Sequence, residues 1–529
     1  MEVTQQTPPA GRKYFIQTFG CQMNVADTER MEALLSETGM TPAPSADRAD
    51  VILVNGCSVR EKAVHKAVSA LGRFQILKNN GRGPLIGLGG CVGQLTKDQL
   101  FNRAPYLDFV FGPDAIDELP EILHQVDHGK RHAVFADFDK SMKYSTRTKV
   151  VGEKAQAFVN IMKGCDKYCS YCIVPFTRGR EKSRTIDEVV DDVAALVEKG
   201  VTEVTLLGQN VNSFGKGNPN AYAREPRELS NRIGKVGPRE GEENFPQLLR
   251  ALDSDPRCAK LKRIRFTSSH PLDFSDQLIE CYAPADQGGV AKLAQHLHLP
   301  VQSGSNRVLQ KMSRHHKIED YIAQMRRLKE LNPLVGISTD LIVGFPTETD
   351  EEFQETIKLL DAIQYDMIFA FAYSPRPGTK AAKMEDDVPK KVKADRLNYL
   401  LDYQLGISAK RYAAKVGQTM EVLVEGEAKN QLMAEREAAK AAISEASSLG
   451  VPGDSGSAHP SMNSATAARV FTGRTTCNRI VNFIASPGQV LGRTPDQMTR
   501  ALNGQLVNVK ITEATSLALY GELALEIPE

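Results

Sequence analysis

The sequence lacks the features that would mark a membrane or secreted protein. No apolar run approaches the length that spans a bilayer, and residues 1–12 contain no apolar core of a secretory signal. The formal net charge is only +1, so bulk charge argues neither for nor against a nucleic-acid partner, and any basic surface must be local. We therefore expect a cytoplasmic protein without a membrane partner.

A disulfide framework is also missing. The nine cysteines are an odd number in a chain of 529 residues, and without a secretory signal they favour thiols and metal ligands over disulfides. Hydrophobic residues make up 41% and charged residues 25% of the chain, the composition of a soluble globular protein. The length is sufficient for three domains.

Three of the cysteines share one short loop. Cys165, Cys169 and Cys172 follow the apolar run 158–162 with the spacing C-x3-C-x2-C. Soft thiolates favour an iron–sulfur cluster or zinc, but a closed zinc site needs a fourth ligand nearby and the next cysteine is Cys258. Three cysteines on a four-iron cluster leave one iron open for a substrate. A structural zinc loop and three unrelated buried cysteines are the alternatives.

Three further cysteines each follow a strand-like run and a glycine. Cys21 comes after the run 13–19, Cys57 after 51–55 and Cys91 after 85–89, with helical stretches between. Alternating strands and helices predict a parallel sheet, in which ligands bind beyond the carboxyl ends of the strands. We interpret these cysteines as ligands of a second cluster with one open iron. The alternative is three buried thiols that act as small apolar side chains.

The middle of the chain repeats a strand followed by a polar loop. Six such units between residues 158 and 378, separated by helical stretches, predict a β/α barrel two strands short of closure, with the polar loops at its mouth. Asp340 falls within a strand run, so it is either buried with a partner or directed into the barrel. The loops supply candidates for cofactor or substrate binding: Gln209, Asn210, Ser268, His270, Gln302, Ser303 and Asp340.

Cations gather around the cysteine loop. This local basic band is either a solvated face or a phosphate-contacting surface, and the sequence does not separate the two. Its members are Lys163, Lys167, Arg178, Arg180, Lys182 and Arg184.

The C-terminal part reads as a small β-barrel. Short strands are predicted at 420–426, 470–475, 478–483, 505–511 and 516–526, which suggests an oligonucleotide-binding type of barrel. Arg474, Arg479 and Lys510 add positive charge, and Phe483 and Tyr520 are candidates for base stacking unless they belong to the core. Residues 427–469 are expected to be an insertion, helical and then disordered, and residues 215–244 a surface loop.

Long motifs in all three regions resemble the radical S-adenosylmethionine (SAM) tRNA methylthiotransferases, and within them the tRNA-2-methylthio-N6-dimethylallyladenosine synthase group. The matching strings are TFGCQMN, NGCSVREKA, GGCVGQ, IMKGCDKYCSYCIVPFTRGRE, LLGQNVN, RIRFTSSHP, HLPVQSGS, LIVGFPTET and SPRPGT. The resemblance implies an α/β multidomain fold. Its parts would be a methylthiotransferase domain at 12–145, a partial radical-SAM barrel at 150–390, and a tRNA-binding TRAM barrel at 416–426 plus 470–527, interrupted by the insertion at 427–469.

The resemblance also implies the chemistry. Cys165, Cys169 and Cys172 would hold the 4Fe–4S cluster that cleaves SAM to a 5′-deoxyadenosyl radical, and Cys21, Cys57 and Cys91 an auxiliary 4Fe–4S cluster. A second SAM would donate the methyl group. The substrate would be the isopentenylated adenosine next to the anticodon of tRNA. The implied partners are an electron donor such as flavodoxin or ferredoxin and iron–sulfur assembly proteins, and the chain would act as a monomer.

Two other functions are compatible with the sequence. One is methylthiolation of threonylcarbamoyladenosine in tRNA or of a ribosomal protein. The other is a non-catalytic iron–sulfur or zinc protein that binds RNA. The strings after Cys21 and Cys57 favour the isopentenyladenosine group by resemblance alone.

Overall fold

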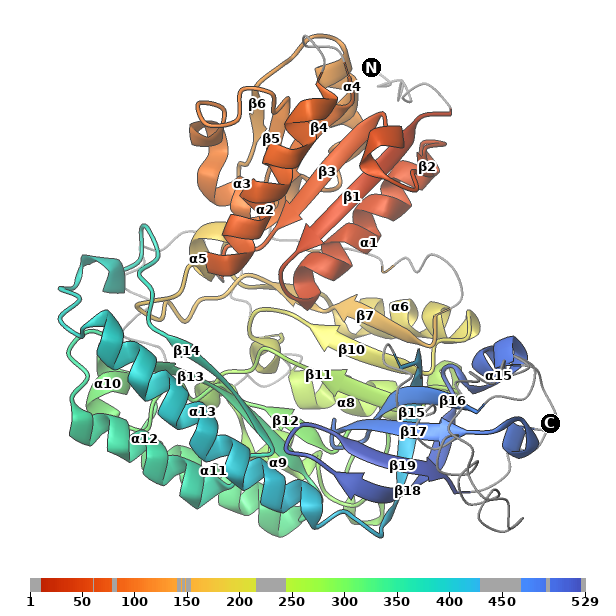
Figure 1. Ribbon diagram of the computed structural model, residues 1–529, viewed down its shortest axis with the longest axis vertical. Helices are drawn as coiled ribbons and strands as arrows, with labels where there is room; N and C mark the ends of the chain where they lie inside the picture. Colours follow the sequence, from red (N-terminus) through yellow and green to blue (C-terminus); the bar gives the residue numbers. More distant parts are fainter. Residues whose placement is uncertain are drawn as a thin grey trace, which may run out of the picture.

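The chain folds into three bodies, which the computed structural model describes for residues 11–59, 61–78, 83–139, 144, 148, 154–215, 244–428, 468–490 and 495–524. The N-terminal domain lies at the top of Figure 1, the central barrel below it, and the small C-terminal barrel at the lower right. Our expectations for residues 1–10, for the surface loop at 216–243 and for the insertion at 429–467 lie outside the described residues.

The N-terminal domain is a six-stranded parallel sheet with the strand order β2-β1-β3-β4-β5-β6. Its centre is apolar on both faces: Leu53 of β3 packs into one core cluster and Ile52 into the other, as expected for a parallel sheet covered on both sides. The strands are β1 (Lys13–Phe19), β2 (Thr41–Pro42), β3 (Val51–Gly56), β4 (Leu85–Gly89), β5 (Phe109–Phe111) and β6 (Ala133–Phe135), and the helices α1 (Gln22–Glu37), α2 (Glu61–Phe74), α3 (Gly90–Thr96) and α4 (Leu119–Asp127).

The central domain holds six parallel strands in two three-stranded sheets, ordered β7-β10-β11 and β12-β13-β14. A parallel bridge between Ile264 and Leu293 joins the two sheets, so the predicted incomplete barrel is confirmed. The strands are β7 (Gln156–Asn160), β10 (Glu203–Leu207), β11 (Arg263–Phe266), β12 (His296–His298), β13 (Gly336–Val343) and β14 (Met367–Ala372), and a short hairpin pairs β8 (Met162–Lys163) with β9 (Lys182–Ser183).

Helices surround these strands, and several begin with capping boxes. Thr185 and Glu188 cap α6, and Thr349 and Glu352 cap α12, which satisfies backbone N–H groups that the first helical turn leaves unpaired. The helices are α5 (Val174–Thr177), α6 (Ile186–Glu198), α8 (Phe245–Ser254), α9 (Asp276–Glu280), α10 (Asn306–Lys311), α11 (Ile318–Leu331), α12 (Asp350–Ile363) and α13 (Lys390–Ala413).

The C-terminal body is a closed five-stranded barrel with the order β15-β16-β17-β19-β18. Phe471 and Phe483 stack in its core with ring centroids 5.9 Å apart, so Phe483 is a core residue, the alternative to base stacking that the sequence left open. Tyr520 is half-buried and Lys510 is exposed. The elements are β15 (Thr419–Glu427), β16 (Arg469–Thr475), β17 (Ile480–Ala485), β18 (Leu506–Ala514), β19 (Leu519–Leu523) and the unpredicted helix α15 (Pro495–Leu502).

The two outer bodies contact opposite ends of the central strands. The C-terminal barrel meets their amino ends: Arg263 of β11 donates to the Arg474 carbonyl (3.2 Å), and Arg265 donates to the Thr475 carbonyl (2.8 Å). The N-terminal domain meets the loops that follow the carboxyl ends, where Lys163 pairs with Asp114 (2.7 Å). The mouth of the barrel therefore faces the N-terminal domain (Figure 1).

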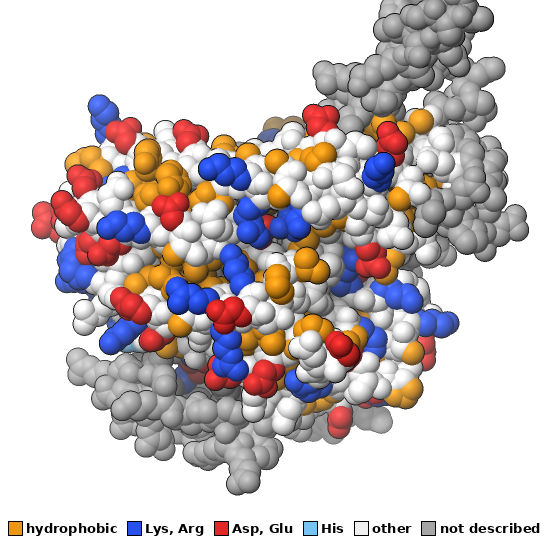
Figure 2. Space-filling view, turned by 90° about the horizontal axis from the view of Figure 1, so that it is seen from below, with side chains coloured by type: hydrophobic (Ala, Val, Ile, Leu, Met, Phe, Trp, Pro, Cys, Tyr) orange, Lys and Arg blue, Asp and Glu red, His pale blue; other side chains and the backbone are white. Residues whose placement is uncertain are grey.

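The surface shows mixed charge. In the view from below, Lys and Arg side chains are interspersed with Asp and Glu over the described part of the molecule (Figure 2), in keeping with the formal net charge of +1. None of the helices in the described ranges is long and apolar enough to cross a membrane.

Candidate functional site

The first cysteine set lies where the carboxyl ends of β1, β3 and β4, neighbours in the N-terminal sheet, meet one edge. The thiols of Cys21 and Cys57 form a hydrogen bond, and both interact electrostatically with Cys91. The structure thus brings together the three cysteines that the sequence predicts to converge. At Gly20, φ is +147° and an added Cβ would lie 2.4 Å from the Cβ of Cys57, so only glycine allows this approach.

In the first set Cys57 and Cys91 are buried and Cys21 is half-buried, and the pKa values of the three thiols differ. The hydrogen bond with Cys57 lowers the pKa of Cys21 to about 6. The same hydrogen bond, followed by burial, raises the pKa of Cys57. Burial also raises the pKa of Cys91, although the nearby Arg178 opposes this. Ionisation of Cys21 is therefore favoured over that of Cys57 and Cys91. Three thiolates at this site would repel one another and would need a cationic partner.

Two asparagines lie next to the first cysteine set and form hydrogen bonds with each other. The Asn24 amide donates to Asn55 Oδ1 (3.0 Å), the Asn55 amide donates to the Asn24 carbonyl (2.8 Å), and Cys21 Sγ lies 3.4 Å from Asn24 Oδ1. Both asparagines are fully buried. Because buried amides are held by their hydrogen bonds, this pair fixes how α1 meets β3. Sequence reasoning missed these two residues, although Asn24 lies in the string TFGCQMN.

The second set lies in the loop between β8 and α5. The Cys165 N–H donates to the Gly179 carbonyl (3.2 Å), and the Cys172 N–H donates to the Cys169 carbonyl (2.9 Å), so the backbone closes the loop on itself. Burial raises the pKa of Cys165 and that of Cys172, the latter to about 12, and the neighbouring thiols add to both shifts. The three thiols of this set therefore also lie close enough to oppose one another's ionisation.

A buried arginine and a neutral histidine flank the second set. Arg314 Nη1 donates to Cys169 Sγ at 3.6 Å, and His270 Nε2 lies 4.0 Å from the same sulfur. Burial, followed by the charge of Arg314, lowers the pKa of His270 well below its ordinary value. His270 Nδ1 accepts the Leu272 N–H (3.2 Å). His270 is therefore uncharged, lines the site beside Cys169, and is held in place by its hydrogen bond with the Leu272 N–H.

The amide pair predicted after β10 borders the second set. Gln209 Oε1 accepts the Gly164 N–H (2.5 Å), and the Asn210 amide donates to Asp273 (2.8 Å). Within the described ranges, Gln209 Nε2 and Asn210 Oδ1 are buried without a hydrogen-bond partner. Such atoms are rare in native proteins and indicate a missing ligand, ion or water. The prediction that these amides face a ligand therefore has a structural basis.

The remaining predicted contacts differ in their roles. Ser268 is half-buried with φ +68°, and Gln302 is buried with φ +80°, backbone conformations that are costly without glycine and often occur at functional sites. The Ser303 hydroxyl accepts the Ser305 N–H (3.2 Å), which is a local turn interaction. Asp340 is half-buried, with a carboxylate oxygen 3.6 Å from His298, so it is neither fully buried nor without a partner.

The basic band is not the surface that the sequence suggested. Each of its six cations forms an ion pair with an aspartate, and all six side chains are largely buried, so neither the solvated face nor the phosphate-contacting surface describes it. Four of the six acids lie far from their cations in sequence, so pairing with them could not be foreseen from local charge. The pairs are Lys163–Asp114, Lys167–Asp273, Arg178–Asp27, Arg180–Asp166, Lys182–Asp139 and Arg184–Asp192.

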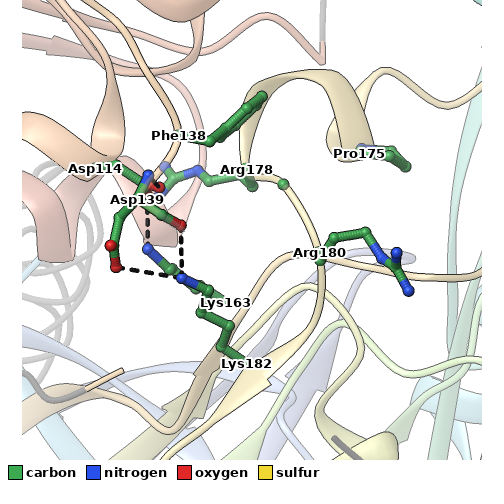
Figure 3. A pocket seen from close by; sticks show the side chains of 9 residues that line it. Asp114, Phe138, Asp139, Lys163, Pro175, Arg178, Arg180 and Lys182 are labelled. Atoms are coloured by element: carbon green, nitrogen blue, oxygen red, sulfur yellow. Dashed lines mark hydrogen bonds and ion pairs between the residues drawn. The ribbon is translucent and has the colours of Figure 1, made fainter. Parts of the chain in front are cut away.

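A pocket of about 220 Å³ opens where the loop after Cys172 meets the N-terminal domain. Figure 3 shows Lys163 and Lys182 pointing toward Asp114 and Asp139, with Phe138 and Arg178 beside them. Because its cations are already paired with carboxylates, the pocket is lined by both charges and does not select an anion by charge alone.

Arg178 connects the two cysteine sets. It follows α5, the helix directly after the second set, and its Nε donates to Cys91 Sγ (3.2 Å) while its Nη2 donates to Asp27 (2.5 Å). Burial lowers the pKa of Arg178, but Asp27 and Cys91 more than offset this, so the guanidinium stays charged. Asp27 and Arg314 were missed by sequence reasoning, because nothing in their local sequence marks them.

The donor sets fit iron–sulfur clusters. All nine cysteines are free thiols, and six of them form two groups of three. In these groups Cys57, Cys91 and Cys169 are buried, and Cys21, Cys165 and Cys172 are half-buried. In the described part of the chain no trio of His, Cys, Asp or Glu is spaced to hold a single metal ion. The cysteines that hold a cubane bind different irons and so lie farther apart than the ligands of one zinc ion. Sets of three thiolates suit the soft iron of such a cluster.

Comparisons with known proteins agree with this chemistry. Residues 13–112 match the uncharacterized protein family UPF0004, and residues 159–360 match the radical SAM superfamily. A solved radical S-adenosylmethionine methyltransferase from Kitasatospora setae is a distant structural neighbour. It is 14% identical, the match covers 70% of this chain and 77% of that chain, and the TM-score is 0.47. The superfamily match identifies residues 159–360 as a radical SAM domain.

Curated relatives narrow the family. A protein of Bdellovibrio bacteriovorus is 37% identical over 99% of this chain and 98% of its own length. One of Myxococcus xanthus is 45% identical over 78% of this chain and 84% of its own. Both are named tRNA-2-methylthio-N(6)-dimethylallyladenosine synthase. The chain belongs to this family, and the resemblance inferred from its motifs is confirmed.

Proposed function

We propose that the protein methylthiolates tRNA at the isopentenylated adenosine next to the anticodon, placing sulfur at C2 and a methyl group on that sulfur. Membership of the synthase family is the observation that carries this proposal. The competing substrates, threonylcarbamoyladenosine and a ribosomal protein, have no feature of the structure in their favour.

In this proposal the two cysteine sets hold two 4Fe–4S clusters. Cys165, Cys169 and Cys172 would bind the cluster that engages SAM, and Cys21, Cys57 and Cys91 the auxiliary cluster. When bound, these groups and SAM supply the radical, the sulfur and the methyl group. The geometry that supports this assignment is the convergence of three thiols in each set and the contact of Arg178 with Cys91.

The protein's own residues bind and orient. The unpartnered amide atoms of Gln209 and Asn210 are placed to hold the polar amino-acid part of SAM. The positive-φ backbone at Ser268 and Gln302 shapes the same wall, and the neutral imidazole of His270 covers Cys169. The N-terminal domain closes the mouth and limits access of water, which protects reactive chemistry.

tRNA would contact both ends of the molecule. The C-terminal barrel, which we assign to the TRAM type, offers exposed Lys510 and half-buried Tyr520, a cation and an aromatic suited to RNA. Because this barrel packs on the amino ends of the central strands, the RNA must extend from there to the mouth. We further propose that the chain acts as a cytoplasmic monomer. It would be reduced by a flavodoxin or ferredoxin and loaded by iron–sulfur assembly proteins.

The test is nucleoside analysis of tRNA from a strain that lacks the gene. The 2-methylthio derivative of isopentenyladenosine should disappear, unmodified isopentenyladenosine should accumulate, and the parent gene should restore the product. Anaerobically reconstituted protein should contain about eight irons per chain. Loss of a methylthiolated threonylcarbamoyladenosine, with the isopentenyl product intact, would contradict the proposal.

A further inference from the structure

The interaction between Arg178 and Cys91 crosses a domain boundary. Cys91 lies in the first turn of α3 in the N-terminal domain, whereas Arg178 follows α5 in the central domain. Arg178 is 6% exposed, and both Cys91 and Asp27 are 3% exposed. A buried guanidinium with two partners of fixed geometry is held in place by its planar fork, so this contact is a built feature of the closed interface.

Its partner Asp27 determines what Arg178 offers the sulfur. The ion pair with Asp27 at 2.5 Å compensates most of the guanidinium charge. What reaches Cys91 is chiefly an N–H donor at 3.2 Å. The first set also receives a donor from its own domain, since the Val59 N–H points to Cys57 Sγ at 3.4 Å. Arg178 differs because its position depends on the loop that carries Cys165, Cys169 and Cys172.

Hydrogen bonds to cluster sulfurs and nearby charge are among the factors that set the reduction potential of an iron–sulfur cluster. A donor to a ligating sulfur stabilises the reduced, more negative state, so it raises the potential. We propose that Arg178 is a positioning residue through which the radical-SAM loop sets the reduction potential of the auxiliary cluster. This inference rests on the proposed role of Cys91 as a ligand of that cluster.

The experiment isolates the auxiliary cluster in the full chain. In a background with Cys165, Cys169 and Cys172 replaced by Ala, the reconstituted protein is titrated anaerobically and its reduced cluster followed by electron paramagnetic resonance. Arg178→Lys keeps the charge, but an ammonium cannot reproduce both contacts of the fork. The midpoint potential should shift to a more negative value than in the same background with Arg178.

A matched control uses a second buried arginine of the same region. Arg184 is 4% exposed and pairs with Asp192 at 2.9 Å. Among the described residues, its guanidinium donates to Asp192 and to the carbonyls of Asn160 and Glu188 and to no thiol. Arg184→Lys should therefore leave the midpoint potential unchanged. An equal shift in both variants would overturn the proposal, because it would show a general effect of weakening a buried pair.

A variant of opposite sign guards against loss of folding. Asp27→Asn removes the compensating charge while its amide oxygen can still accept from Arg178, so the midpoint potential should move to a more positive value. Each variant is first checked for about four irons per chain. Retained iron with an unmoved potential in Arg178→Lys overturns this inference alone. Retained iron in a Cys91→Ala variant overturns instead the ligand assignment in the proposed function.

Discussion

The two ends of the central barrel are joined to their neighbours by the same kind of interaction, yet only one end is built for chemistry. At the mouth, Arg178 reaches into the N-terminal domain and pairs with Asp27. At the base, Arg263 reaches the C-terminal barrel at Glu421 (3.2 Å), and Arg479 of that barrel pairs with Asp366. Buried arginines therefore join the domains at both ends.

The two domain interfaces differ in where buried polar groups lack hydrogen-bond partners. At the mouth, several buried side-chain atoms have no hydrogen-bond partner among the described residues, including Gln209 Nε2, Asn210 Oδ1 and Arg314 Nε. At the base, Arg263 and Arg265 share Glu203 and also donate to backbone carbonyls. Arg479 Nε also lacks a partner there within the described ranges, so the distinction lies in position: only at the mouth do the unpartnered atoms lie beside a cysteine loop, where they indicate a ligand site.

The largest effect on activity is expected from Cys165→Ala at the mouth of the barrel. Removing one of three ligands should remove the site where SAM is bound, so reductive SAM cleavage and methylthiolated tRNA should both fall below detection. The assay is anaerobic turnover with chromatographic detection of cleaved SAM. SAM cleavage at the parent rate by this variant would contradict the assignment of the second set.

Cys91→Ala separates the two sets. Iron should fall by about half and methylthiolated product should vanish, but SAM cleavage should persist because the second set is intact. Iron analysis and the same turnover assay test this. Loss of SAM cleavage together with product would indicate that the two sets form one interdependent site.

At the base, Glu203→Gln should affect stability and spare the chemistry. It leaves two buried arginines, Arg263 and Arg265, without their shared carboxylate, and breaking a buried pair costs about 3–5 kcal/mol. The unfolding transition should move to lower denaturant, while iron content and SAM cleavage per folded molecule stay at parent values. Arg257→Ala, which breaks a surface pair with Asp255, should leave the transition in place.

Gly164→Ala should perturb the mouth more mildly than loss of a ligand. Gly164 has φ +76°, and a Cβ there would lie 2.0 Å from the Arg180 carbonyl, so the cysteine loop must shift. Backbone strain of this kind costs about 1–3 kcal/mol. We expect the second set to retain less iron after reconstitution while the first set is filled normally. Gly200→Ala, also at positive φ but with open space around it, provides the control.

The sequence predicts the strands and helices and the grouping of the cysteines, but not the ion pairs that join the domains. The strands before Cys57 and Cys91 were predictable because buried parallel strands are continuous apolar runs. The strand before Cys21 was predictable from its alternating pattern, and the six strands of the barrel repeat one pattern. The convergence of two cysteine sets followed from strand order and loop spacing, which are local properties.

What the sequence could not reveal depends on contacts between distant segments. Arg178 and Asp27 lie 151 residues apart in the sequence. Because such a partner is not visible locally, the excess of cations around the loop could be interpreted as surface charge. Arg314 looks like any surface cation until the fold buries it against Cys169. Phe483 was ambiguous because an aromatic on a short strand suits either a core or a base, and only barrel closure decides.

The smallest expected effect is a pH dependence at the base. Burial raises the pKa of Asp366, but the guanidiniums of Arg479 and Arg411 outweigh it, so its pKa lies below the ordinary value. A carboxylate whose pKa is lower in the folded state contributes stability above the unfolded pKa of about 3.9, and this contribution is lost as the pH falls. Denaturant midpoints of the parent should therefore decrease below about pH 5. Asp366→Asn should start from a lower midpoint at neutral pH and fall less steeply on acidification. Parallel curves for parent and variant would show that the Asp366 joint does not carry the acid sensitivity of the base.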